Sequence, residues 1–310
     1  MNAAATPARI RQVGAGVVSE PMRPVAIVTD STHYTTRELI AQAGVREVSL
    51  YVADGDGSRR ESEIVDYDAF YARLRDGAAL PTTSQPSIGD FVAAYEPLLA
   101  AGNDIVSIHL AGGISGTVGA AAQAKALLDE RREGGEGRIA VIDARTACGG
   151  LGCVVLAAAA SARAGGDLSA VLARTQEARA ALRIWFCIDT LTYLQRGGRI
   201  GRAQAWVGGA LKVKPILSLE AEITPVERVR TSGRAFERMV DYLRSRRDEG
   251  ADGWVVQHIQ APDRAAELVE RGRELFGCEP QWVSEVGPVI GTYTGPGLLG
   301  IGGVPARLLH

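Results

Sequence analysis

The stretch DIVSIHLAGGISGTVGAAAQAKALLDERR, residues 104–132, decides the fold class. Its first seven residues are largely apolar and rich in β-branched side chains, which is typical of a buried strand, and a glycine turn and an alanine-rich helical run follow. The same order of strand and helix recurs before and after this stretch. We expect strands over residues 25–28, 45–52, 104–110 and 139–142. We expect helices between them over residues 36–44, 66–75, 87–101, 115–132 and 148–165. This rhythm predicts a parallel sheet covered by helices on both faces.

The pattern changes after Gly165-Gly166. Two apolar runs follow each other closely, over residues 214–220 and 223–230, which predicts an antiparallel pair. Around this pair we expect helices over 168–180, 232–247 and 262–276, strands over 183–188 and 253–259, and extended segments over 279–286 and 288–293. The sequence therefore predicts an α/β protein of two domains. After a flexible tail of residues 1–21, a parallel-sheet α/β/α domain spans residues 22–165 and a smaller mixed-sheet α/β domain spans residues 166–310.

Composition limits the function classes. The chain has 310 residues, of which 46% are hydrophobic and 23% charged, as in ordinary globular proteins. Lys and Arg number 34 against 36 Asp and Glu, so the net charge of −2 argues against nucleic acid as a partner. No apolar run is long enough to cross a membrane, and the first residues lack a secretory pattern, so we expect a cytoplasmic protein without stable membrane insertion. The four cysteines lack metal-ligand or disulfide spacing and are expected to be buried free thiols.

Ligands of an open parallel sheet collect where strands end and helices begin. The segment PTTSQPS, residues 81–87, places Thr83 and Ser84 between two prolines before a helix that Ser87 and Asp90 are expected to cap. The turn GISGT, residues 113–117, precedes the alanine-rich helix, where free N–H groups favour an anion. We therefore take Thr83, Ser84, Ser115, Gly116 and Thr117 as ligand-binding candidates. The turn matches neither a P-loop nor a dinucleotide fingerprint.

An Arg/Gly-rich loop, QRGGRIGR over residues 195–202, is suited to phosphate or an acidic partner. We expect Arg196, Arg199 and Arg202 to dock a partner. The four histidines are scattered, and the sequence has no motif for a metal, a nucleophile or a general base. The residue pattern thus favours a binding protein without catalytic residues or metal ligands over an enzyme.

Several separated motifs together resemble the DegV family, over about residues 24–302. They are, in chain order, Thr29-Asp30-Ser31-Thr32, the segment 81–87, Ile114-Ser115-Gly116-Thr117, Ile188-Asp189-Thr190-Leu191 with Arg196-Gly197-Gly198-Arg199-Ile200, Lys214-Pro215-Ile216-Leu217 and Gly295-Pro296-Gly297. The resemblance implies a fatty-acid-binding protein with a lipid tunnel between two α/β domains. In some members it implies the binding subunit of an ATP-dependent fatty acid kinase.

The resemblance also implies roles for single residues. Thr83 and Ser115 match the residues that hold the fatty-acid carboxylate in the family. Tyr293 stands where the family often has histidine in a His-x-Gly-Pro-Gly ending, so we expect a neutral hydroxyl at the head group. We expect a cytoplasmic carrier of a long-chain fatty acid, with no cofactor beyond that ligand and a fatty acid kinase as partner. The alternative is an enzyme acting on a small phosphorylated or keto substrate, related to dihydroxyacetone kinase-like domains.

Overall fold

The computed structural model describes residues 23–310 except 56, 78–79, 132–136 and 208–212. The expected tail of residues 1–21 lies outside these described residues. The first domain is built on a four-stranded parallel sheet of order β2-β1-β6-β7. In sheet order its strands are β2 (Arg46–Val48), β1 (Val25–Asp30), β6 (Asp104–His109) and β7 (Ile139–Asp143).

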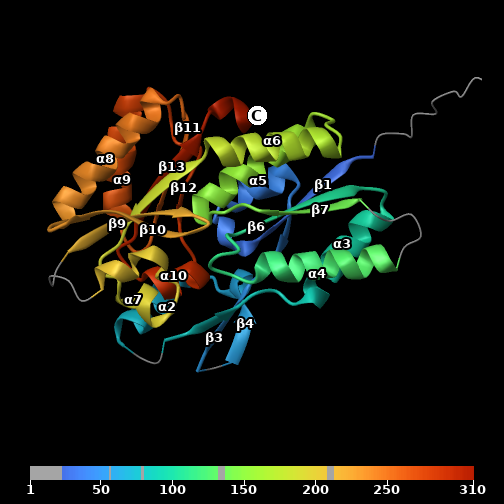
Figure 1. Ribbon diagram of the computed structural model, residues 1–310. Coiled ribbons are helices and arrows are strands. Elements are labelled where there is room, and N and C mark those ends of the chain that lie inside the picture. Colours follow the sequence, from blue (N-terminus) through green and yellow to red (C-terminus); the bar gives the residue numbers. More distant parts are fainter. Residues whose placement is uncertain (1–22, 56, 78–79, 132–136, 208–212) are drawn as a thin grey trace, which may run out of the picture.

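Helices cover both faces of this sheet (Figure 1). One face carries α3 (Ile88–Ala100) and α4 (Thr117–Glu130). The other carries α5 (Cys148–Arg163) and α6 (Leu168–Ala181), with α1 (Arg37–Ala43) against α5. The predicted α/β/α sandwich is therefore confirmed. The helix α6, which begins beyond Gly165-Gly166, packs on α5 and β6.

A small antiparallel sheet, β4-β3-β5, extends the first domain. Its strands are β3 (Tyr51–Asp54), β4 (Gly57–Arg60) and β5 (Thr82–Ser84), and α2 (Tyr67–Arg75) lies between β4 and β5 in the chain. The single strand expected over residues 45–52 is wrong, because the chain divides it between two sheets. Ser49 and Leu50, both buried, form the break between β2 and β3.

The second domain is a six-stranded mixed sheet of order β10-β9-β8-β13-β11-β12, in which only the β11–β12 pair is parallel. In chain order its strands are β8 (Arg183–Cys187), β9 (Lys214–Glu220), β10 (Glu222–Val229), β11 (Gly253–His258), β12 (Val283–Glu285) and β13 (Leu299–Val304). The predicted antiparallel pair is confirmed as β9–β10. The long helices are α8 (Ser232–Asp248) and α9 (Pro262–Phe276), with the short α7 (Thr192–Arg196) and α10 (Pro288–Thr294) near the first domain.

The extended segment expected over residues 288–293 is a helix, α10. Its β-branched side chains favour a strand, but the tertiary structure overrides this preference. Thr292 and Thr294 turn their hydroxyls back onto helix carbonyls, and the first free N–H groups of the helix find acceptors in the first domain. The strand β13 was not predicted at all, because its sequence LGIGGV is rich in glycine.

The helix α5 lies between the two main sheets, in the middle of the molecule (Figure 1). Twelve of its residues, from Gly149 to Ala160, are buried. The apolar cluster around α5 joins side chains of both domains, including Val106 of β6 and Val255 of β11. Among the described residues, no helix combines the length and the apolar character needed to cross a membrane.

Candidate functional site

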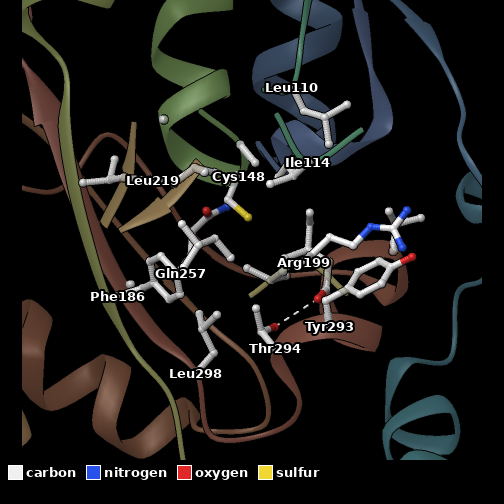
Figure 2. A pocket seen from close by; sticks show the side chains of 18 of the residues that line it. Leu110, Ile114, Cys148, Phe186, Arg199, Leu219, Gln257, Tyr293, Thr294 and Leu298 are labelled. Carbon is white, nitrogen blue, oxygen red and sulfur yellow. Dashed lines mark hydrogen bonds between the residues drawn. The ribbon is translucent and has the colours of Figure 1, made fainter. Parts of the chain in front are cut away.

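A cavity of about 240 Å³ lies between the two domains. It is larger than the roughly 150 Å³ that hold a benzene molecule in an apolar protein interior. Side chains of both domains line it. The first domain contributes Leu50, Leu110, Ile114 and the start of α5, and the second contributes β8, β13 and α10. Figure 2 shows Phe186, Leu219 and Leu298 together at one side and Arg199 and Tyr293 together at the other.

The polar end of the cavity joins three residues that are distant in sequence. The Tyr293 hydroxyl on α10 is 2.6 Å from Thr83 Oγ1 on β5, so the two domains share a hydrogen bond there. The Arg199 guanidinium lies over the Tyr293 ring, 4.9 Å from its centre. All three residues line the cavity. This end therefore offers two hydroxyls and a positive charge, a combination that suits an anion.

Local pairing fixes the orientation of Thr83. On β5 it pairs with Val52 of β3, which is fully buried. Pro86, which has no N–H to donate, follows the strand, and Ser87 then starts α3 in the predicted capping box with Asp90. The segment around Thr83 is therefore a short strand between two prolines, which the sequence analysis did not predict. Ser84, the second hydroxyl candidate of this segment, also lines the cavity.

The turn before α4 brings Ser115 and Gly116 to the same cavity. Gly116 is packed so closely against Gln85 that a Cβ there would lie 2.4 Å from Gln85 Oε1. The close approach places this turn beside the Thr83 segment. Ser115 Oγ is 2.8 Å from Thr117 Oγ1 and accepts a hydrogen bond from the Thr117 amide. Thr117 itself is fully buried and does not line the cavity, so its contact with the site is through Ser115. The helix begins at Thr117, two residues later than predicted.

Glycines make room for the apolar part of the cavity. Gly300 and Gly302 lie two residues apart on β13, and Gly149 and Gly150 lie in the first turn of α5. A Cβ at Gly302 would lie 2.5 Å from a methyl group of Ile184, whereas a Cβ at Gly300 would meet nothing closer than 3.6 Å. This wall was not predicted from the sequence. The alternation of glycine with Leu299 and Ile301 was the available signal, since alternate residues of a strand share a face.

Two polar side chains lie deeper in the cavity, Cys148 and Gln257 (Figure 2). Gln257 donates to the Tyr34 carbonyl and to Ser284 Oγ, and accepts from the Gly149 amide, so its amide group is fully used. Burial raises the pKa of the Cys148 thiol well above its ordinary value. The thiol is therefore neutral and presents a polarisable, weakly polar surface. The expectation that all four thiols are buried holds for Cys153 and Cys187, but Cys148 is partly exposed and Cys278 is exposed.

The three arginines of the Arg/Gly loop have different surroundings. Arg199 lines the cavity, while Arg196 and Arg202 are exposed beside it. The Arg202 side chain is 68% exposed and lies 3.9 Å from Glu222, at the far edge of an ion-pair distance. Arg199 thus belongs to the cavity wall, whereas Arg196 and Arg202 are exposed and do not line the cavity.

A Ser–His–Asp row lies in the first domain, and none of its three members lines the cavity. Asp30 Oδ2 is 3.1 Å from His109 Nδ1, and His109 Nε2 is 2.7 Å from Ser107 Oγ. Burial alone would raise the pKa of Asp30, but hydrogen bonds from His109, Thr32 and the Leu110 amide lower it overall. All three members of the row are completely buried. The row therefore fixes the backbone at the end of β6, because Asp30 accepts a hydrogen bond from the Leu110 amide.

In the part of the chain described, His, Cys, Asp and Glu side chains form no group of three suited to a metal ion.

Comparisons with known proteins identify the family. The model of the DegV family, described as uncharacterised proteins, matches residues 24–306. A DegV domain-containing protein of Streptomyces coelicolor is 39% identical over 282 residues, which are 90% of this chain and 98% of the relative. The predicted resemblance is therefore confirmed.

Solved structures agree with this result. A DegV family protein of Thermus thermophilus, described by its fatty acid binding, has a TM-score of 0.80 and 34% identity, covering 91% of this chain and 99% of its own. DegV of Bacillus subtilis, described as a fatty acid binding protein, gives the same four values. The predicted two-domain fold class is confirmed by these neighbours. The chain is therefore a member of the DegV family.

Proposed function

We propose that this protein binds a long-chain fatty acid, with the acyl tail in the cavity between the domains and the carboxylate near Thr83 and Ser115. The observation that carries the proposal is the cavity itself, which is apolar along its length and has hydroxyls and a guanidinium at one end. Relatives at 34% identity that are described as fatty acid binding support it.

The tail provides most of the affinity in this proposal. Each methylene removed from water contributes about 0.8 kcal/mol, so roughly 14–18 methylenes supply on the order of 10 kcal/mol before entropic costs. The head group then fixes the direction in which the molecule enters. Native mass spectrometry of the protein expressed in bacteria tests the function directly. A retained acyl chain supports it, whereas a retained small phosphorylated or keto compound supports the enzyme alternative.

Removing the hydroxyls at the polar end is expected to weaken binding. Thr83→Ala and Ser115→Ala should each weaken affinity for a fluorescent long-chain fatty acid about tenfold, the usual effect of losing a hydrogen bond to a charged group. Thr83→Ala also removes the partner of the Tyr293 hydroxyl. Thr82→Ala is the matched control, because Thr82 is the exposed neighbour of Thr83 on the same strand. Affinities equal to that of Thr82→Ala would disprove the carboxylate site.

We further propose that the bound carboxylate is presented to a separate ATP-dependent fatty acid kinase, and that Arg196 and Arg202 dock it. Both arginines are exposed, and each is three residues from Arg199, which lies at the polar end of the cavity, so we expect an acidic or nucleotide-bearing partner to meet them there.

Charge reversal separates docking from binding. Arg196→Glu with Arg202→Glu should leave fatty acid affinity unchanged and lower phosphorylation of the bound fatty acid by the organism's fatty acid kinase about tenfold or more. Arg199 stays unchanged in this variant, because it lines the cavity. Reversal of Arg244 and Arg247, exposed on the distant α8, controls for net charge. Equal phosphorylation in the two double variants would contradict the docking role.

A further inference from the structure

Glu61 is a buried carboxylate that joins the two domains without a basic partner among the described residues. Only 2% of this residue is exposed. It follows β4 in a short 3-10 helix, Glu61–Glu63. Its Oε2 atom accepts a hydrogen bond of 2.5 Å from the Ser31 hydroxyl, and its Oε1 atom accepts one of 2.7 Å from the Tyr34 hydroxyl. All three residues belong to the first domain.

The same Oε1 atom reaches across to the second domain. It accepts a hydrogen bond of 2.8 Å from the Val289 amide, in the first turn of α10. The Ile290 amide donates to the Tyr34 hydroxyl at 3.3 Å. These amides are helix-start donors that have no partner within the helix. A carboxylate and a phenol of one domain thus satisfy the first turn of a helix that belongs to the other.

The chain before α10 is held just as closely. The Tyr71 hydroxyl donates to the carbonyls of Val286 and Gly287 at 2.6 and 3.0 Å. A Cβ at Gly287 would lie 2.6 Å from Tyr34, 2.8 Å from the Tyr67 hydroxyl and 3.0 Å from Glu61 Oε1. Only glycine fits there, so the backbone before α10 is in close contact with the first domain. Figure 1 shows α10 beside α2, which carries Tyr67 and Tyr71.

The helix that Glu61 holds is also the helix that faces the ligand. Val289, Ile290, Tyr293 and Thr294 of α10 line the cavity. One turn after the Glu61 contact, Tyr293 reaches Thr83 of the first domain. The short helix is therefore tied to the first domain at both of its ends. Its position along the cavity depends on these two attachments.

We propose that Glu61 is a positioning residue for the ligand site, which sets α10, and through it Tyr293, against the cavity. This inference rests on the proposed function. A neutral amide would satisfy the Val289 amide with a weaker, uncharged hydrogen bond, and a buried charge is costly to retain. In its charged form, which dominates above pH 7, the Glu61 carboxylate holds the start of α10 more firmly than an amide would, and this places Tyr293.

A double-mutant cycle tests this role. Glu61→Gln should weaken affinity for cis-parinaric acid, a fluorescent 18-carbon fatty acid, about tenfold, the size of coupling that such indirect contacts carry. Tyr293→Phe should weaken it as well. Combining the two should cost little more than either one, because both act on the same attachment. The control is Glu63→Gln, an exposed carboxylate in the same 3-10 helix. Unchanged affinity in Glu61→Gln, or losses that simply multiply, would overturn the proposal.

A measurement without ligand keeps this inference separate from the proposed function. Hydrogen exchange of the Val289 and Ile290 amides should become at least tenfold faster in Glu61→Gln, while exchange in β6 should be the same as in the unchanged protein. Fast exchange of α10 supports the positioning role even if the protein binds no fatty acid. Unaltered exchange of α10 overturns it even if fatty acid binding is observed.

Discussion

Replacing Gly300 with leucine is expected to weaken binding of a 16- to 18-carbon fatty acid about 100-fold. A leucine side chain at this position on β13 occupies the space of about four methylenes of the acyl tail, each contributing about 0.8 kcal/mol. The loss is then about 3 kcal/mol, or roughly two powers of ten in affinity. The backbone accepts the change, because a Cβ at Gly300 would be in ordinary van der Waals contact with its neighbours. Titration with a series of fatty acids of different length measures the effect.

The length series also provides the control. An eight-carbon acid should lose much less affinity, since it leaves part of the tail space empty. Gly300→Ala adds one methyl group and should have a small effect on every ligand. Gly302 is unsuitable for this experiment, because a Cβ there would collide with Ile184 and with the Arg183 carbonyl. Full affinity of Gly300→Leu for long chains would show that the tail lies elsewhere.

The stability of Glu61→Gln should differ from that of the unchanged protein in a pH-dependent way. Burial raises the pKa of Glu61 from its ordinary 4.5 to about 7, against the opposing hydrogen bonds from Ser31, Tyr34 and the Val289 amide, and the nearby charge of Glu47 adds to the rise. The folded protein therefore holds this proton more tightly than the unfolded chain does. Its free energy of unfolding accordingly falls as the pH rises from about 4.5 to 7, by about 3 kcal/mol through this group.

Glutamine carries no proton to lose, so the variant lacks this contribution. Its stability relative to the unchanged protein should increase between pH 5 and pH 8 by up to about 3 kcal/mol. Urea unfolding at several pH values measures the difference, and other titrating groups cancel because both proteins share them. Glu63→Gln should follow the unchanged protein throughout. Parallel curves for Glu61→Gln would mean that the buried carboxylate does not titrate in this range.

Much of the fold could be predicted because its signals are local. The β-branched run of β6, the glycine turn and the alanine-rich α4 specify their own conformations, and Ser87 and Asp90 form the capping box that their spacing predicts. The prediction failed where distant residues decide. Residues 288–294 favour a strand by composition, but Glu61 and Tyr34 satisfy the start of a helix there. No local pattern encodes that contact.

The residues of the candidate site also fall into two groups, those with a local sequence signal and those without one. Thr83 and Ser115 stood out because hydroxyls lie beside prolines and glycines at strand ends. The apolar wall did not stand out, because Phe186, Leu219 and Leu298 have the composition of any core and only the packing of two sheets leaves a space among them. Glu61 was missed as well, since nothing in the sequence around it shows that the side chain is buried. Both features arise from the contact between domains.

The helix α5, buried between the two sheets, has a consequence for the way the protein unfolds. Its alanine-rich surface packs on β1 and β6 on one side and on β11 and β13 on the other. Neither sheet keeps its apolar covering if the other loses its order, because the same helix supplies both. The two domains are therefore distinct in architecture but not in thermodynamics. Heat or denaturant should melt them in one cooperative transition, and an acyl chain bound between them would raise the stability of both together.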